Sequence, residues 1–380
     1  MSQKVLEQIS SDDLKNLFSE HSTKKIFLVT GKGSYVKSGA QNYIESSLEG
    51  YEYVRFSDFE QNPKLEDALR GLELIKASQC DMVLAIGGGS VIDMAKLINI
   101  FLANEHIDGL EIVQNSKLIT KKGYYFIAIP TTAGTGSEAT HFAVVYHNNK
   151  KYSVAHPFVL PDVVGLNSEF TFSQSPYLTA CSGLDALSQA IESYWSTGAN
   201  EESKGYAKQA ITLLLEHLEP CVLSPSSAHR TAVMQGAYLA GKAINISKTT
   251  VAHAMSYAFT TYFSIPHGHA VFLTLPQFLI ENYKVSDAKI NDIRGNMYVK
   301  NTMLELYKIL NVNSPLEAFH LLLNLTHTIR IETSFKTLGI GISDLDIILD
   351  SVNLERLKNN PIDFSKAELK SILLNCFNQE

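Results

Sequence analysis

A buried strand that runs directly into four small residues and then into a helix is the feature that most constrains this fold. Residues 81–86 read DMVLAI, an apolar run of strand length, and residues 87–90 read GGGS. Residues 91–102 then have the apolar spacing of a helix. Glycine lets a backbone approach a ligand closely, and the free amides and dipole at a helix start favour an anion. This unit therefore predicts a phosphate-binding turn at the carboxyl end of a strand.

A second strand followed by a turn of small residues has the same character. The apolar run 125–129 leads into Thr131 and Thr132, and the turn continues through Thr135 and Ser137. Two such turns at the carboxyl ends of two strands indicate one nucleotide or dinucleotide in the crevice beside them. Neither turn has the GxGxxG spacing of the usual dinucleotide fingerprint, and no acidic residue follows at the usual distance. Tight turns without a ligand are the alternative interpretation.

The first part of the chain alternates strands with helices, which predicts a mostly parallel, doubly wound sheet. Further strands are expected at residues 25–29 and 51–56, and a helix at 65–77. Residues 142–146 and 151–155 have the pattern of a hairpin, which we expect to extend that sheet.

The second part of the chain has helical periodicity in nearly every segment. A length of 380 residues also favours two domains. We therefore predict an α/β dinucleotide-binding domain over residues 1–170 and an all-helical metal and substrate domain over residues 171–380. A ligand site is expected in a cleft at their junction, because such junctions are common ligand sites.

Four side chains in the helical part have the chemistry and spacing of metal ligands. Asp185 and Gln189 are four residues apart, so they share one face of a helix. His253 and His267 cannot share one straight helix, because Pro266 interrupts it. A helix followed by a turn could still bring both imidazoles to the first pair. The pattern predicts a divalent metal site, although a single helical histidine is more often structural.

Composition excludes several classes of protein. The net charge is −7 and no lysine- or arginine-rich stripe is present, which argues against a nucleic-acid partner. The four cysteines are widely spaced and form no CxxC pair, so neither a structural zinc site nor a disulfide framework is indicated. The first residues are polar, and the apolar runs are too short or too interrupted to span a bilayer. We therefore expect a cytoplasmic protein with no membrane partner.

The residues in these motifs resemble the iron-containing alcohol dehydrogenase family, which is related to glycerol dehydrogenases and dehydroquinate synthases. The matching pieces cover the whole chain in the family's order: GGGSVIDMAK at 87–96, IPTTAGTGSEAT at 129–140, GLDALSQAIES at 183–193, HAMSYAF at 253–259 and PHGHAVFLTLP at 266–276, with weaker matches FSDFEQNP at 56–63 and LKNNP at 357–361. The resemblance implies reversible alcohol and aldehyde chemistry in the cleft between a dinucleotide domain and a helical metal domain.

The resemblance also implies a ligand set for the metal. The family holds its metal with an aspartate, a histidine four residues later and two further histidines. Asp185, His253 and His267 match three of these positions, whereas Gln189 stands where the family has its first histidine. An amide oxygen is a harder and weaker donor than an imidazole nitrogen, so we expect lower metal affinity and less preference for zinc. Fe²⁺ is the expected ion, with Zn²⁺, Mn²⁺ and Ni²⁺ as alternatives, and Gln189 outside the coordination sphere is the alternative arrangement.

The cofactor positions implied by the resemblance lie in the first domain. They are Gly31, Lys32, Asn62, Gly87, Gly88, Gly89, Ser90, Asp93, Thr131, Thr132, Thr135 and Ser137. The family often has an aspartate just after the first strand, which binds the ribose 2′-hydroxyl and repels a 2′-phosphate. Gly31 takes its place here, and Lys32, Ser34 or Lys37 could contact a phosphate. We therefore expect NADPH as a cofactor, alone or beside NADH; Lys32 as a solvated loop lysine is the alternative.

Other pieces resemble the phosphonoacetaldehyde reductase branch of the family. They are ATHFAVVY at 139–146, KYSVAHP at 151–157, AGKAINISKTT at 240–250, Gln189 and HGHA at 267–270. A dianionic phosphonate needs concentrated positive charge and donors. The candidates are Lys242, Lys248, His141, His269 and Asn245. Lys242 lies in a small, apolar helical segment and must reach a partner or water, so a lysine that extends to solvent is the alternative.

The expected reaction is NAD(P)H-linked reduction of phosphonoacetaldehyde to 2-hydroxyethylphosphonate, with the metal polarising the carbonyl. Tyr257 stands where the family often has a histidine near the substrate, and it joins His269 and Lys242 as the candidate catalytic residues. The alternatives are a general alcohol or 1,2-diol dehydrogenase, a lyase like dehydroquinate synthase, and a non-catalytic protein that kept the cofactor fold. The resemblance also implies a homodimer or larger homo-oligomer.

Overall fold

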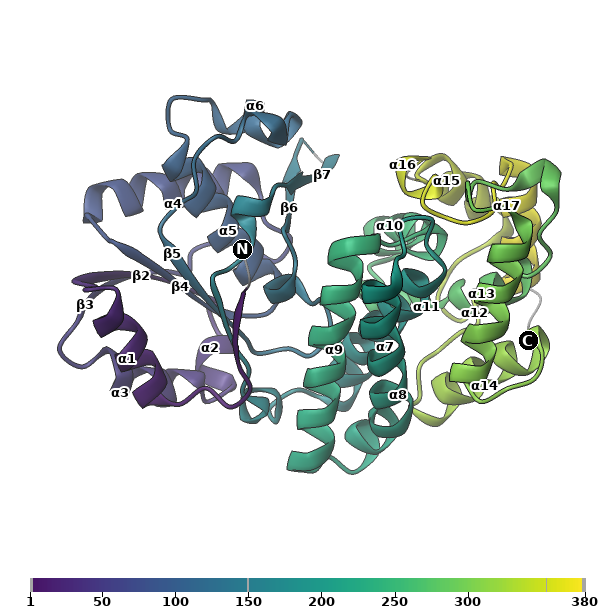
Figure 1. Cartoon of the computed structure of the whole chain (residues 1–380), viewed down its shortest axis with the longest axis horizontal. Coiled ribbons are helices and arrows are strands. Elements are labelled where there is room, and N and C mark those ends of the chain that lie inside the picture. Colours follow the sequence, from purple (N-terminus) through teal and green to yellow (C-terminus); the bar gives the residue numbers. More distant parts are fainter. Residues whose placement is uncertain (1–2, 149, 353, 378–380) are drawn as a thin grey trace. The chain divides into compact units, whose positions relative to one another are not determined.

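The computed structural model describes residues 3–148, 150–352 and 354–377 (Figure 1). The chain divides into two compact units, of which the first ends at Gln174 and the second begins at Ser175. The sequence predicts this boundary after residue 170. No helix in the described ranges combines the length and apolar character needed to cross a bilayer.

The first unit is built on a six-stranded sheet in which every neighbouring pair of strands is parallel. In sheet order the strands are β1 (Lys4–Leu6), β8 (Val163–Gly165), β5 (Tyr125–Pro130), β4 (Met82–Gly87), β2 (Lys25–Thr30) and β3 (Glu52–Phe56). The helices of this unit are α1 (Ser11–Glu20), α2 (Ser34–Lys37), α3 (Ala40–Leu48), α4 (Leu65–Ser78), α5 (Gly89–Ala103) and α6 (Gly109–Gln114). The predicted α/β architecture is confirmed.

Alternating side chains of each central strand enter two separate cores. In β4, Val83 and Ala85 pack with residues of α4 and α5, whereas Leu84 and Ile86 pack with residues of α1 and α3. The helices accordingly cover both faces of the sheet in Figure 1. A strand buried on both faces has a continuous apolar sequence, which is why DMVLAI has no polar alternation.

The hairpin did not join this sheet, and that expectation was wrong. Strands β6 (Phe142–His147) and β7 (Lys150–Ala155) pair antiparallel in a two-stranded sheet of their own. Strand β8 pairs with β5 instead. Two side chains of α5 form hydrogen bonds with the backbone of β6. Asp93 accepts from the Val144 N–H at 2.9 Å, and Lys96 donates to the Phe142 carbonyl at 2.6 Å. The hairpin therefore packs on α5.

Regular structure in the described part of the second unit is helical. Its α-helices are α7 (Pro176–Trp195), α8 (Glu201–Leu223), α9 (Ser227–Ser247), α10 (Val251–Phe263), α11 (His267–Phe272), α12 (Leu275–Glu281), α13 (Asn296–Ile309), α14 (Pro315–Thr328), α15 (Leu345–Asp350), α16 (Leu354–Leu357) and α17 (Lys366–Phe377). Figure 1 shows α7, α8 and α9 side by side, and these three helices contact one another extensively.

Polar residues cap the starts of the three long helices, and a proline separates α10 from α11. Ser175, Asn200 and Ser226 accept backbone N–H groups at the starts of α7, α8 and α9, as N-cap residues do. Pro266 follows the end of α10 and precedes α11, so the expected interruption between His253 and His267 is present.

Candidate active site

Helix α7 presents a row of buried polar side chains on one face. Asp185, Gln189 and Glu192 follow one another at spacings of four and three residues, and their exposed fractions are 3%, 4% and 0%. Helices α8, α9 and α11 pack around α7, so these side chains lie inside the unit. Buried carboxylates require partners, which makes the groups opposite them informative.

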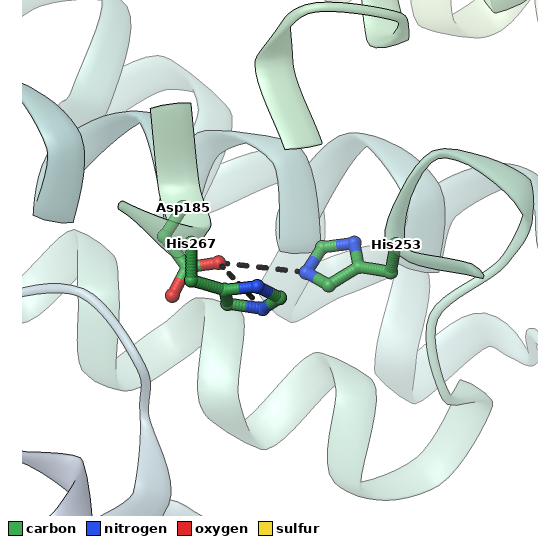
Figure 2. A group of neighbouring side chains, drawn as sticks. All are labelled: Asp185, His253 and His267. Atoms are coloured by element: carbon green, nitrogen blue, oxygen red, sulfur yellow. Dashed lines mark ion pairs between the residues drawn. The ribbon is translucent and has the colours of Figure 1, made fainter. Parts of the chain in front are cut away.

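Three candidate ligands converge from three helices. Figure 2 shows Asp185 of α7, His253 of α10 and His267 of α11 pointing toward one another. Their candidate ligand atoms all lie within 4.8 Å of one another. The Asp185 Oδ1 atom is 3.5 Å from His253 Nε2 and 3.9 Å from His267 Nε2. These separations are too long for strong hydrogen bonds and leave room for an ion between the atoms.

Gly268 allows the two helices to approach closely enough for this arrangement. A Cβ atom at position 268 would lie 2.0 Å from the Cys181 carbonyl oxygen and 2.7 Å from the Asp185 Cβ. Only glycine therefore fits where α11 crosses α7. The spacing of His267 from Asp185 depends on this contact.

Glu192 binds the ring nitrogen of His253 that does not face Asp185. The sequence did not single out Glu192. Its Oε2 atom pairs with His253 Nδ1, while Oε1 accepts from Thr250 Oγ1 at 2.7 Å and from the Ala252 N–H at 2.8 Å. One carboxylate thus orients the imidazole and binds a free amide at the start of α10. The available sequence signal was its place seven residues after Asp185 on the same helix face.

Glu192 and His253 each stabilise the charged form of the other. Burial acts to lower the pKa of His253, but the carboxylates of Glu192 and Asp185 raise it to about 9. Burial also acts to raise the pKa of Glu192, but His253 and Thr250 outweigh it and keep that pKa below its ordinary value. Without a metal, His253 is therefore an imidazolium paired with carboxylates at neutral pH.

The residues present fit a divalent metal ion. His253 Nε2 is buried and has no hydrogen-bond partner within the described residues, while its Nδ1 is held by Glu192. Two imidazole nitrogens and a carboxylate oxygen are ligands that iron, zinc and related ions accept. Gln189, one helical turn from Asp185, adds an amide oxygen on the same face.

Tyr257 lies beside this group, one turn after His253. Its ring is nearly parallel to that of His267, with centroids 6.4 Å apart and an interplanar angle of 12°. The Ser256 hydroxyl lies 3.4 Å from His267 Nδ1. Tyr257 is half-buried and so borders the candidate metal site.

His269 and Lys242 have other contacts. His269 is buried, its Nδ1 lies 3.1 Å from the Tyr177 hydroxyl, and its Nε2 donates to the Glu332 carbonyl at 2.6 Å. Burial lowers its pKa, so this histidine is a neutral link between segments. The Lys242 ammonium lies 3.9 Å from the centroid of the Tyr206 ring. These contacts give a structural reason for each side chain and do not support a catalytic role.

The two turns of the first unit pack against each other at the carboxyl ends of β4 and β5. The Thr131 N–H donates to the Gly87 carbonyl at 3.0 Å. A Cβ at Gly88 would lie 3.3 Å from Thr132, and one at Gly89 would lie 2.7 Å from the Thr135 hydroxyl. Helix α5 starts here without a side-chain cap, so its first amides remain directed at this edge.

A third segment reaches the same edge. The Asn62 N–H donates to Ser90 Oγ at 3.3 Å, and Asn62 has a left-handed backbone with φ of 62°. This contact brings the predicted cofactor positions Asn62 and Ser90 together. A glycine-rich turn, a helix start and a polar loop are features that bind phosphate groups.

Asp93 and Ser137, two of the predicted cofactor positions, are buried and hydrogen-bonded to each other. Asp93 Oδ1 accepts from the Ser137 hydroxyl, and its other oxygen accepts from β6. Lys96, which sequence reasoning left without a role, donates to the carbonyls of Ser137 and Thr140 at 2.6 and 2.7 Å. Burial raises the pKa of the neighbouring Glu138 to about 7. These residues hold the second turn on α5.

The turn after β2 carries the residues expected beside the ribose. Lys32 forms an exposed ion pair with Asp58 at 2.8 Å. Arg55, which the sequence did not single out, donates to Thr30 Oγ1 at 2.7 Å and to the Gly31 carbonyl at 3.3 Å. An exposed pair contributes little to stability, so Lys32 can exchange Asp58 for another anion.

The fold and the two sites define a protein class: a parallel nucleotide-type α/β unit joined to a helical unit with a three-ligand cluster. Residues 3–168 match the family model for iron-containing alcohol dehydrogenase, and residues 179–377 match the C-terminal model of the Fe-containing alcohol dehydrogenase family. The chain belongs to the iron-containing alcohol dehydrogenase family. It is an enzyme of the alcohol dehydrogenase and aldehyde reductase class.

Relatives of this chain span almost its whole length. The NADPH-dependent butanol dehydrogenase of Clostridium saccharobutylicum is 31% identical over 96% of this chain and 93% of its own. The sulfoacetaldehyde reductase of Bilophila wadsworthia is 28% identical with the same coverage, 96% and 93%. The crystal structure of sulfoacetaldehyde reductase from Bifidobacterium kashiwanohense in complex with NAD⁺ is 26% identical, with a TM-score of 0.88 over 100% of this chain and 98% of that one.

Proposed function

We propose that this enzyme reduces phosphonoacetaldehyde to 2-hydroxyethylphosphonate with NADPH or NADH. The convergence of Asp185, His253 and His267 carries the proposal, because it assembles a divalent-metal donor set next to a half-buried tyrosine. The family supports the reaction class. The anionic substrate is our own inference from the motifs that resemble the phosphonoacetaldehyde reductase branch.

We assign the metal to Asp185, His253 and His267, with the Gln189 amide oxygen as a fourth ligand. When bound there, a divalent ion supplies Lewis-acid polarisation of the substrate carbonyl. Glu192 keeps the His253 Nδ1 proton in place, so that the Nε2 lone pair faces the site. Fe²⁺ is the ion we expect.

We assign the dinucleotide to the paired turns of the first unit, with its phosphates at the start of α5. The nicotinamide supplies the hydride. Position 31 is a glycine, so it has no carboxylate to repel a 2′-phosphate. The exposed Lys32 supplies a positive charge next to Gly31. These features support NADPH as a substrate of the enzyme.

We assign to Tyr257 the proton that completes the alcohol. Its ring lies beside His267, and a phenolic O–H is a competent donor to an alkoxide oxygen. Replacement by Phe would keep the ring and remove the proton.

The substrate class is supported by one set of relatives and opposed by another. A sulfonate aldehyde and a phosphonate aldehyde share a tetrahedral oxyanion, and two proteins similar to this chain are named sulfoacetaldehyde reductases. The relative named for butanol represents the alternative, a dehydrogenase of neutral alcohols.

Substrate competition in the purified enzyme tests the proposal. Protein reconstituted with Fe²⁺ under anaerobic conditions would be given phosphonoacetaldehyde, sulfoacetaldehyde, propanal or lactaldehyde, and NADPH oxidation would be followed. We expect kcat/KM for phosphonoacetaldehyde to exceed that for propanal by about 100-fold. Equal or better rates with propanal would assign the enzyme to neutral alcohols. The same assay with NADH tests the cofactor, and a preference for NADH of about 100-fold would exclude NADPH.

A further inference from the structure

Arg356 is a cationic side chain beside Tyr257, on a different element from Lys242 and Lys248, the lysines that the sequence suggested. It lies on the short helix α16, and its Cζ atom is 5.8 Å from the centroid of the Tyr257 ring. That ring is the one that lies nearly parallel to His267. Tyr257 therefore contacts both a guanidinium and a candidate metal ligand.

A hydrogen bond fixes the position of this guanidinium. Arg356 Nη1 donates to Thr249 Oγ1, and Asn359 Nδ2 donates to the Thr249 carbonyl at 3.2 Å. Thr249 is buried and lies two residues before α10, the helix that carries His253 and Tyr257. The side chain is thus held at the end of α10 nearest His253. A guanidinium carries its N–H donors in a planar fork, and the bond to Thr249 Oγ1 sets the orientation of this fork.

Lys248 is a second cationic residue, next in the sequence to Thr249, the hydrogen-bond partner of Arg356. It is exposed, and its backbone has φ of 64° and ψ of 172°, a conformation that residues with side chains rarely adopt. Such strain persists where the surrounding structure requires it, and it concentrates at functional sites. The buried carboxylates nearby, Asp185 and Glu192, are directed at His253.

We propose that Arg356 binds the anionic group of the substrate, a phosphonate or sulfonate on a two-carbon aldehyde. The planar fork matches two oxygens of a tetrahedral oxyanion, and Lys248 strengthens the positive field. In the substrate only two carbons separate the anionic group from the carbonyl oxygen. This short separation suits Arg356, because only the Tyr257 ring lies between its guanidinium and His267. Arg356, not Lys242, then determines the preference for anionic aldehydes. This inference rests on the proposed function and names the residue that would give it its substrate class.

Two substitutions of Arg356 test the role, with Arg330 as the matched control. Arg330 is an exposed arginine of the same unit, just after α14. For Arg356→Met we expect kcat/KM to fall about 100-fold with phosphonoacetaldehyde and sulfoacetaldehyde, and far less with propanal. Arg356→Lys should recover part of the loss, because it restores charge without the fork. Arg330→Met should keep the wild-type ratio between anionic and neutral aldehydes. Lys242→Met in the same assay separates the two candidate cations.

Binding without turnover gives an independent measurement. Methylphosphonate should inhibit propanal reduction competitively and raise the unfolding temperature of the wild-type protein, and both effects should be lost in Arg356→Met. Equal losses for propanal and the anionic aldehydes would assign Arg356 to the attachment of α16 alone and overturn its role. An anionic preference kept in Arg356→Met, or lost instead in Lys242→Met, would also overturn it while the proposed function stands. A wild-type enzyme that prefers propanal would overturn the proposed substrate, and this inference with it.

Discussion

Glu192 shows how one buried residue can decide the geometry of a candidate site: it lies on α7 with Asp185 and orients His253 of α10. It contributes no atom to the group of three candidate ligands, yet it pairs with His253 Nδ1 and with the start of α10. A ligand histidine whose second nitrogen is held by a carboxylate has a defined tautomer and a fixed ring. The same logic explains why a carboxylate with an exposed fraction of 0% is present inside the helical unit.

Replacing Glu192 with Gln should weaken metal binding by about 10- to 100-fold, because Gln orients the imidazole without a negative charge. Titration of the metal-free protein with Co²⁺, followed by the visible absorption of the bound ion, measures this affinity. Thr250→Val is the control, since it removes a hydrogen bond to the same carboxylate and one from Trp195, but keeps the pair between Glu192 and His253. If both variants bound Co²⁺ as tightly as the wild type, Glu192 would have no role in the site.

A second prediction at this scale concerns Glu138, whose pKa is raised by burial to about 7. A carboxyl with a raised pKa stabilises the fold fully below its unfolded pKa, and the contribution is lost as pH rises through the folded pKa. Gln at position 138 stays neutral at every pH. The difference in free energy of unfolding between Glu138→Gln and the wild type should therefore shift by about 2 kcal/mol in favour of the variant as pH rises from about 5 to about 8. Chemical denaturation at each pH measures the difference. Glu49→Gln, at an exposed site of the same unit, should show none, and parallel curves for Glu138→Gln and wild type would contradict the assignment.

At the scale of elements, the second unit depends on how closely α11 lies against α7. Each helix alone is ordinary, and the contact between them sets the distance from His267 to Asp185. Gly268 is the point of closest approach, because a methyl group there would overlap the Cys181 carbonyl. The motif PHGH therefore combines a helix start, a candidate ligand and a packing glycine in four residues.

Gly268→Ala should displace α11 and lower the free energy of unfolding by about 2–3 kcal/mol, because backbone atoms cannot yield as a side chain can. Metal affinity should fall as well, since His267 moves with the helix. Urea denaturation and the Co²⁺ titration measure the two effects. Gly205→Ala is the control: a Cβ there meets no atom within 4 Å, and the change should stabilise α8 by about 0.5–1 kcal/mol. Two variants with the same stability would show that the contact is not tight.

At the scale of the whole molecule, the two kinds of chemistry belong to different units. The paired glycine-rich turns lie before residue 174, and the candidate metal ligands lie after residue 175. Each site is formed by contacts inside its own unit. Cofactor binding and metal binding should therefore be separable.

Removal of the metal tests this separation. Dialysis against a chelator should abolish aldehyde reduction, while the Kd for NADPH, measured by fluorescence titration, should change by less than about threefold. Addition of Fe²⁺ should restore activity. Loss of NADPH binding together with activity would show that the metal is needed for the cofactor site, and full activity after chelation would exclude a catalytic metal.

Local sequence patterns predicted strands β2, β3, β4 and β5, the two turns of small residues and the break at Pro266, but not the short strands β1 and β8. They also determined which residues are candidate ligands, because periodicity, glycine and proline act over a few residues. The family resemblance then supplied the reaction class, and the family match confirmed it.

Only the tertiary structure decided which distant side chains meet. It pairs Glu192 with His253 by a hydrogen bond, and it places the cations of Lys242 and Arg356 against the rings of Tyr206 and Tyr257. It also placed the 142–155 hairpin on α5, because α5 offers side chains that satisfy backbone groups of β6 and β8 occupies the neighbouring place in the sheet. A buried charge takes the partner that packing brings to it, and the spacing of residues along the chain does not contain that information.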